Sequence, residues 1–125
     1  NIPLLKRNTE YQGFTENSPT VKYFWQFLEC CTLEEQYLYL KFAWGRTRLP
    51  KDDSGFLNDK HCISKMEDVK EDEINKKLPM SHTCFFTVDF PPYTNYEILK
   101  EKLMYAMRNS LIISDSENVL NLDLA

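Results

Sequence analysis

The sequence predicts an α+β fold: a small mixed domain with a helical hairpin, a short sheet of few strands and one further helix. Three observations indicate this class. Apolar residues recur at helical spacing on both sides of residue 32, residues 83–90 are rich in β-branched and aromatic side chains, and residues 94–97 carry a helix-start pattern. The chain of 125 residues is 42% hydrophobic, which suits one compact core.

The first helix is predicted from a start signal and an apolar stripe. Ser18 is a candidate N-cap, and Pro19 stands at the first helical position, where its missing N–H is not needed. The stripe at i, i+3, i+4 and i+7 consists of Val21, Phe24, Trp25 and Leu28.

The second helix begins after Thr32. Thr32 and Glu35 have the spacing of a capping box, and Gly45 is a natural stop at the other end. Its predicted apolar stripe is Leu33, Tyr37, Leu40 and Trp44.

Later segments supply the sheet and the third helix. We predict a short strand over 61–66, a charged loop without periodicity to residue 77, and a strand over 83–90 that Pro91-Pro92 ends. A capping-box pattern starting at Thr94 predicts a helix from Asn95 to about Arg108, with no strong pattern in the tail 109–125.

Composition excludes several classes of function. The net charge is −4 with no basic face, so we expect no nucleic-acid partner. No apolar run approaches the roughly 20 residues that cross a bilayer, and we expect no membrane partner. With no signal-peptide pattern and no initiator Met, the chain reads as a piece of a longer protein.

Cysteine spacing argues against disulfides and metal. Cys30 and Cys31 are adjacent in a helical segment, no C-x-x-C pair occurs, and only two histidines are present. We therefore expect free thiols in a reducing compartment, namely the cytoplasm with the nucleus as a second candidate, and neither a metal nor a cofactor.

Cys84 is the candidate for chemistry, because it stands where an irregular segment meets the predicted strand, beside Ser81, His82 and Thr83. A thiol with a pKa near 8.5 is roughly 3% thiolate at pH 7, which suffices for thioester exchange. On residue chemistry alone a buried structural thiol is the commoner outcome. His82 would lie on the same side of an extended chain as Cys84, near it without necessary contact.

Several segments together resemble one family. Residues 78–85 read L-P-M-S-H-T-C-F, before a strand and P-P-Y, and are similar to the segment around the catalytic cysteine of HECT-type ubiquitin ligases. The same order of landmarks runs from about residue 8 to 108. They are T-E-Y at 9–11, Y-F-W-Q at 23–26, F-A-W-G-R-T-R-L-P at 42–50 and Y-E-I-L-K-E-K-L at 96–103. The sequence of residues 44–50 favours the large HERC type within the family.

The resemblance implies a fold and a division of the chain. Residues 9–125 would form the catalytic C-terminal lobe, with 109–125 as its tail, and residues 1–8 would be the end of the upstream lobe and the hinge. The larger upstream lobe, which docks the conjugating enzyme in this family, is missing. The segment 52–77 is also unusually charged for the family.

The resemblance also implies a mechanism. Cys84 would take ubiquitin from a ubiquitin-conjugating enzyme as a thioester and pass it to a lysine of a protein substrate. His82 and Thr83 match positions beside the nucleophile, where they would position sulfur or assist proton transfer, and Phe85 would pack and orient the strand. Many members end with Phe four residues from the C-terminus, where this chain has Leu122 as a weaker binding candidate.

Two other functions stay open. A module that binds ubiquitin or a partner without turnover is the first alternative, although the complete motif around Cys84 argues against it. A cysteine hydrolase is the second, and it needs a base and an orienting group beside the thiol.

Overall fold

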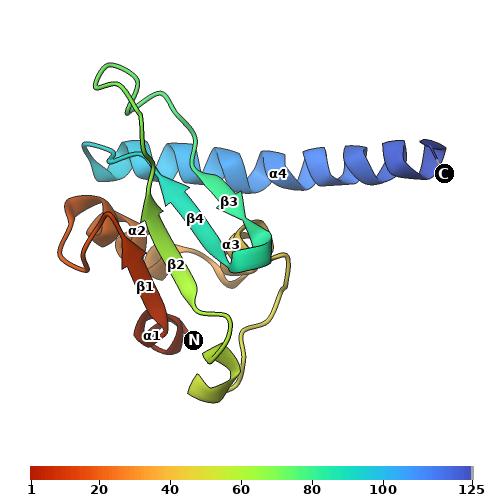
Figure 1. Ribbon diagram of the computed structural model, residues 1–125, viewed down its shortest axis with the longest axis horizontal. Coiled ribbons are helices and arrows are strands. Elements are labelled where there is room, and N and C mark those ends of the chain that lie inside the picture. The colour runs from red at the N-terminus through yellow and green to blue at the C-terminus, as the bar shows by residue number, and fades with distance from the viewer. Residues whose placement is uncertain (125) are drawn as a thin grey trace.

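The computed structural model describes the backbone of residues 1–124 and the side chains of residues 1–110. The chain forms a mixed sheet of four strands in the order β1-β2-β4-β3. Figure 1 shows this sheet in front of helices α2, α3 and α4. The predicted α+β class, with a helical hairpin, a short sheet and a further helix, is confirmed.

The helical hairpin forms at the predicted boundaries. Helix α2 spans Pro19–Cys30 and α3 spans Leu33–Trp44. The capping box of Thr32 and Glu35 is present, and Gly45 ends α3 with a left-handed φ of 77°. Ser18 precedes α2 as predicted, but its hydroxyl accepts a hydrogen bond from the amide of Thr15 and does not cap the helix.

The predicted stripe of α3 is only half correct. Leu33 is 64% exposed and Tyr37 46% exposed, whereas Leu40 and Trp44 are buried. The buried side of the helix also carries Tyr39, Phe42 and Ala43. The first turns of α3 therefore leave the core, and the residues from Tyr39 onward enter it.

The first residues hold two elements that the sequence did not predict. Helix α1 spans Ile2–Arg7, and Pro3 stands in its first turn, where a proline fits, instead of interrupting it. Strand β1, Thr9–Gln12, follows directly and pairs in parallel with β2, His61–Lys65. Leu4 and Leu5 of α1 lie in the same core as the rest of the chain. The assignment of residues 1–8 to an upstream lobe stays a prediction.

The last helix starts one residue later than predicted and is longer. Helix α4 spans Tyr96–Leu124, so the predicted end near Arg108 is wrong. Asn95, and not Thr94, accepts the hydrogen bond from the amide of Ile98. Thr94 instead makes two hydrogen bonds with the side chain of Asn75, which fastens the charged loop 66–77 to the start of α4.

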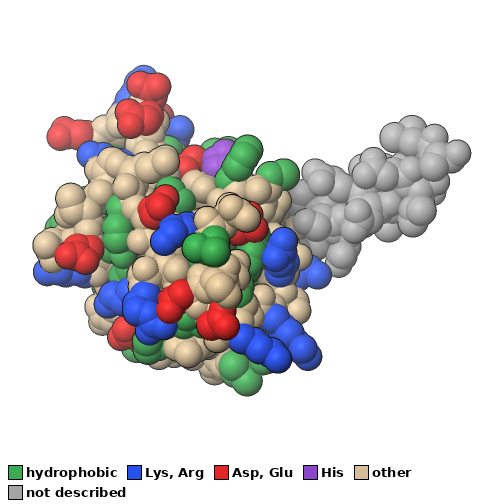
Figure 2. All heavy atoms as spheres, turned by 60° about the horizontal axis from the view of Figure 1, so that its bottom comes forward, with side chains coloured by type: hydrophobic (Ala, Val, Ile, Leu, Met, Phe, Trp, Pro, Cys, Tyr) green, Lys and Arg blue, Asp and Glu red, His purple; other side chains and the backbone are tan. Residues whose placement is uncertain are grey.

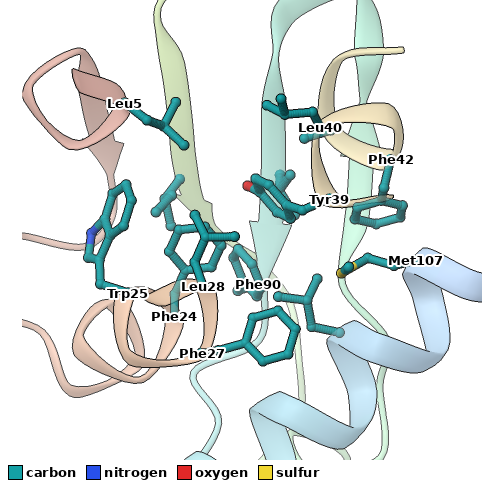
Figure 3. Packing of buried hydrophobic residues seen from close by; sticks show 14 of the residues in the cluster. Leu5, Phe24, Trp25, Phe27, Leu28, Tyr39, Leu40, Phe42, Phe90 and Met107 are labelled. Carbon is teal, nitrogen blue, oxygen red and sulfur yellow. The ribbon is translucent and has the colours of Figure 1, made fainter. Parts of the chain in front are cut away.

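The core lies between the helices and one face of the sheet. Aromatic and aliphatic side chains from α2, α3, β4 and α4 meet there, and Figure 3 shows Phe24, Tyr39, Phe90 and Met107 among them. Phe24, Trp25 and Trp44 are core residues as predicted. The opposite face of the sheet is polar, because alternate strand residues point to opposite faces. It carries Glu10, Gln12, Cys62, Ser64, Met80, His82, Thr87 and Asp89.

The surface mixes charges of both signs. Figure 2 shows acidic and basic side chains interspersed over one face of the molecule, without a patch of one sign. Among the residues that the structure describes, no helix combines the length and apolar character needed to cross a membrane.

Candidate functional site

Cys84 lies at the tip of a β-hairpin. Strand β3, Met80–His82, and strand β4, Thr87–Phe90, pair antiparallel, with His82 opposite Thr87. The 3-10 turn Thr83–Phe85 joins them and carries Cys84, whose side chain is exposed. The predicted continuous strand over 83–90 is therefore wrong for 83–86, because the pairing register requires these residues to reverse the chain.

Phe86 closes this turn in a conformation that is rare for its type. Its φ of 49° and ψ of 45° lie in the left-handed region, which costs about 1–3 kcal/mol for a residue with a Cβ. The turn rotates Phe86 into the core, where it is fully buried, and leaves Phe85 75% exposed. The carbonyl of Phe86 also accepts a hydrogen bond of 3.0 Å from the amide of Cys62 on β2.

His82 is bound to a carboxylate. Its Nε2 lies 2.8 Å from Oδ2 of Asp89, with the two side chains 46% and 26% exposed. The carboxylate accepts, so Nε2 carries a proton, and the neutral ring then has its lone pair on Nδ1. Because Thr83–Phe85 is a turn, the argument that His82 and Cys84 share one side of an extended strand does not hold.

Asp89 was missed by the sequence reasoning. It follows His82 by seven residues, and only the hairpin register places the two on the same polar face. The chain offers no motif that marks this pair. A prediction of the hairpin with its turn at 83–86 would have found it.

The other predicted residues have different surroundings. Thr83 is exposed on the turn, and its carbonyl accepts from the amide of Phe86. Phe85 does not pack against the strand as predicted, because it lies on the 3-10 turn with its ring exposed to solvent. Leu122 lies outside the residues whose side chains the structure describes.

A shallow hollow of about 330 Å³ adjoins the turn. Cys84 and Phe85 of the turn line it, together with Cys62 of the polar sheet face. Two other segments also line it, with Glu10 from β1 and the 75% exposed Leu57 after the 3-10 helix Asp53–Phe56. The exposed thiol of Cys84 therefore borders this hollow.

A larger hollow of about 500 Å³ lies elsewhere, between α1, α3 and residues 47–51. None of the predicted site residues lines it. The chemistry of this chain is therefore better sought in the smaller hollow beside Cys84.

The four cysteines differ in access and in acidity. Cys62 is buried, and this burial raises the pKa of its thiol, with nearby Glu10 and Asp89 acting in the same direction against a hydrogen bond from Thr87. Burial, followed by the charge of Glu35, raises the pKa of Cys31 to about 11. Of the four, Cys30 and Cys84 are the exposed thiols.

A metal has no evident place in this region. Within residues 1–110, whose side chains are described, no group of three or more His, Cys, Asp or Glu side chains lies close enough to hold an ion.

Comparison with known proteins identifies the family. The family model described as "HECT-domain (ubiquitin-transferase)" matches residues 1–112. That match covers most of the chain, and it includes the hairpin and every described predicted site residue. The chain belongs to the HECT-domain family, as its sequence motifs predicted.

Individual relatives agree with this assignment. The chain is 36% identical over 106 residues to human E3 ubiquitin-protein ligase HERC2, 31% over 104 residues to mouse E3 ubiquitin-protein ligase HUWE1, and 33% over 106 residues to E3 ubiquitin-protein ligase pub1 of Schizosaccharomyces pombe. These alignments cover 85%, 83% and 85% of this chain. They cover only 2% of HERC2, 2% of HUWE1 and 14% of pub1.

Proposed function

We propose that this chain is the catalytic lobe of a ubiquitin-protein ligase and that Cys84 carries ubiquitin as a thioester. The observation that carries the proposal is the exposed thiol of Cys84 at the tip of the hairpin, inside a segment that matches the HECT-domain family. A thiol held on a tight turn and surrounded by open space is accessible to two large partners in succession.

The proposed reaction has two transfers. In the first, Sγ of Cys84 attacks the carbonyl carbon that joins ubiquitin to the cysteine of a conjugating enzyme, and that cysteine leaves as a thiolate. In the second, a lysine amine of a protein substrate attacks the same carbon, an isopeptide bond forms, and Cys84 leaves as a thiolate. Each step passes through a tetrahedral oxyanion, and the attacking amine must lose a proton in the second.

His82 is assigned to this second transfer. Its hydrogen bond to Asp89 holds the ring on the polar face of the sheet and keeps a proton on Nε2, so Nδ1 can accept a proton from the lysine. Thr83 stands next to Cys84, where its hydroxyl can donate to the developing oxyanion. The proposal gives neither side chain the role of a base toward Cys84, because sulfur is intrinsically nucleophilic and the group that it attacks is an activated thioester.

Phe85 and Leu57 are proposed as contacts for ubiquitin. Both are 75% exposed and line the hollow beside Cys84, although side chains of this size are normally buried. An extended ubiquitin C-terminus leading to Cys84 would cover them. Leu122 is kept as a weaker candidate for binding.

The partners that follow are ubiquitin, a conjugating enzyme docked through an upstream lobe, and protein substrates. We place the reaction in the cytoplasm, with the nucleus as a second candidate. We also expect the chain alone to load ubiquitin more slowly than a longer chain that includes an upstream lobe, because that lobe would supply the docking site.

A loading reaction tests the proposal. Activating enzyme, ATP, ubiquitin and a panel of conjugating enzymes are mixed with the chain, alone or with an upstream HECT lobe, and adducts are resolved on non-reducing gels. We expect a thiol-sensitive adduct that Cys84→Ala abolishes and that Cys84→Ser converts to a more stable oxyester. The matched control is Cys30→Ala, which removes the other exposed thiol and should leave loading unchanged.

Two results would favour the alternatives. No adduct with any conjugating enzyme, even with the upstream lobe present, would refute thioester transfer and favour a module that binds without turnover. Release of ubiquitin that depends on Cys84 without any lysine acceptor would favour a hydrolase.

A further inference from the structure

An aromatic stack joins the end of helix α3 to the turn that carries Cys84. The rings of Trp44 and Phe86 lie parallel, with centroids 4.2 Å apart and planes inclined by 3°. The guanidinium of Arg46 lies 4.2 Å from the centroid of the Trp44 ring. Helix α3 runs behind the sheet in Figure 1, and it contacts both this turn and β3.

Phe86 is the residue that determines the shape of the turn. Thr83–Phe85 is a single 3-10 turn, and the left-handed conformation of Phe86 separates it from β4. This conformation is unfavourable for phenylalanine, so it persists only where the surroundings enforce it. The parallel face of Trp44 is the closest aromatic contact of Phe86, and His61 packs on it with centroids 4.8 Å apart.

One side-chain hydrogen bond restrains the turn from its solvent side, because the hydroxyl of Thr87 donates to the carbonyl of Phe85 at 3.1 Å. Thr83, Cys84 and Phe85 are all exposed. The amide of Phe86 makes only a long hydrogen bond, 3.5 Å, to the carbonyl of Thr83. The position of the thiol therefore also depends on how firmly the core holds Phe86, two residues after Cys84.

We propose that Trp44, with Arg46 on its ring, is a positioning residue for Cys84 and acts through Phe86. The stack keeps Phe86 in its left-handed conformation and thereby holds the Cys84 thiol at the tip of the hairpin, in the orientation that thioester exchange requires. The inference rests on the proposed function of Cys84, because the orientation matters for the rate only if Cys84 is the nucleophile.

The residues of this stack differ in exposure to solvent. A variant at an exposed member can therefore test the positioning role without lowering the stability of the core. Trp44 and Phe86 are buried, whereas Arg46 is exposed. Arg46 can therefore be removed without opening a cavity. Its contribution comes from the attraction between a cation and the face of an aromatic ring.

The first measurement needs no ubiquitin. In the whole chain, amide hydrogen exchange is followed at Phe86 and at Cys62, whose N–H donates to the Phe86 carbonyl. Alkylation of Cys84 is followed in parallel by peptide mass spectrometry. We expect Trp44→Leu and Arg46→Ala to accelerate exchange at these two amides selectively and to change the alkylation rate of Cys84, with the smaller effect for Arg46→Ala, while Trp44→Phe restores most of the protection.

The matched control is Phe27→Leu, which shortens a buried aromatic residue of α2. It should raise exchange of all core amides in proportion to lost stability, without selecting the turn. If Trp44→Leu and Arg46→Ala also raise exchange only uniformly, the positioning role is wrong. Arg46→Ala keeps this test decisive even if Trp44→Leu does not fold.

The second measurement is the single-turnover transfer of ubiquitin from a conjugating enzyme to Cys84. Displacement of a reacting atom by about 1 Å can reduce a rate by as much as 100-fold. We therefore expect Trp44→Leu to lower the maximal rate by roughly tenfold or more. The concentration of ubiquitin-loaded conjugating enzyme that gives half of the maximal rate should not change. An unchanged maximal rate with a loosened turn would overturn the proposal. Absence of transfer in the unchanged chain with an upstream lobe would instead refute the proposed function, and the exchange result would stand independently.

Discussion

The hydroxyl of Tyr39 on α3 donates a hydrogen bond of 2.6 Å to Nε2 of the fully buried His61 on β2. The opposite nitrogen, Nδ1, lies 2.8 Å from the hydroxyl oxygen of Thr9. That hydroxyl already donates to the carbonyl of Leu5, so Nδ1 must carry the proton and Nε2 must accept. One neutral tautomer thus links α1, β1, β2 and α3 inside the core.

This network predicts how stability depends on pH. Burial lowers the pKa of His61 to about 3. Between about pH 3 and 6.5, His61 is therefore protonated in the unfolded chain and neutral in the folded chain. The contribution of His61 to the free energy of unfolding is therefore fully present above about pH 6.5 and is lost as the pH falls toward 3. The loss between pH 7 and pH 5 amounts to about 2 kcal/mol.

The measurement is urea unfolding at pH 7 and pH 5 for the chain and for His61→Gln. Carboxylates titrate in both proteins. The change in the free energy of unfolding between pH 7 and pH 5 therefore differs between them only by the contribution of His61. Ser64→Ala, which changes a side chain that does not titrate in this range, is the control and should keep the pH dependence of the unchanged chain. An identical pH dependence with and without His61 would contradict the buried neutral tautomer.

The pair of His82 and Asp89 is expected to act in transfer to lysine more than in loading. Asp89→Asn removes the charged acceptor of the 2.8 Å hydrogen bond, and His82→Gln removes the proton acceptor. Each should slow discharge of loaded Cys84 to free lysine by about 100-fold, the lower end of the contribution of general base catalysis. Because the two residues act as one unit, the double variant should be no slower than His82→Gln.

The assay is single-turnover discharge from pre-loaded protein at several pH values. Ser64→Ala serves as control, since Ser64 lies opposite Asp89 on β2 and takes no part in the pair. Additive losses in the double variant would show that His82 and Asp89 act separately.

Phe85→Ala should separate binding from stability. The ring is 75% exposed, so its removal should change the free energy of unfolding by less than about 0.5 kcal/mol. If the ring contacts ubiquitin, the concentration of ubiquitin-loaded conjugating enzyme needed for half-maximal loading should rise. Tyr105→Ala, at a 56% exposed aromatic residue of α4, provides the comparison and should leave loading unchanged. Equal effects of both variants would argue against a contact specific to Phe85.

The start of α4 offers a test of capping. Asn95→Ala removes the side chain that accepts from the amide of Ile98, and it should lower the free energy of unfolding by about 1 kcal/mol. Thr94→Ala leaves that cap in place and loses its hydrogen bond from Asn75 on an exposed surface, so its cost should be smaller. Chemical denaturation of the two variants gives the comparison. A larger decrease in the free energy of unfolding for Thr94→Ala would support the predicted capping box that starts at Thr94.

Local patterns were sufficient for the hairpin of helices. The cap of Thr32 with Glu35 and the stop at Gly45 are interactions within a few residues of one another, so they can be read directly from the chain. Strand β2 and the end of β4 before Pro91 were predicted for the same reason. Helix α1 and strand β1 were missed, because six and four residues are too short to show a period.

The sequence by itself determined the family, the fold class and the identity of Cys84 as the candidate nucleophile, since each depends on residue types at fixed spacing along the chain. The tertiary structure decided the surroundings of that cysteine. Pairing of His82 with Thr87 converts the predicted strand at 83–86 into a turn, and the same register brings Asp89 to His82. The face of Trp44 meets Phe86 from a helix distant in the sequence. These relationships depend on strand register and on packing between distant segments, which no local pattern encodes.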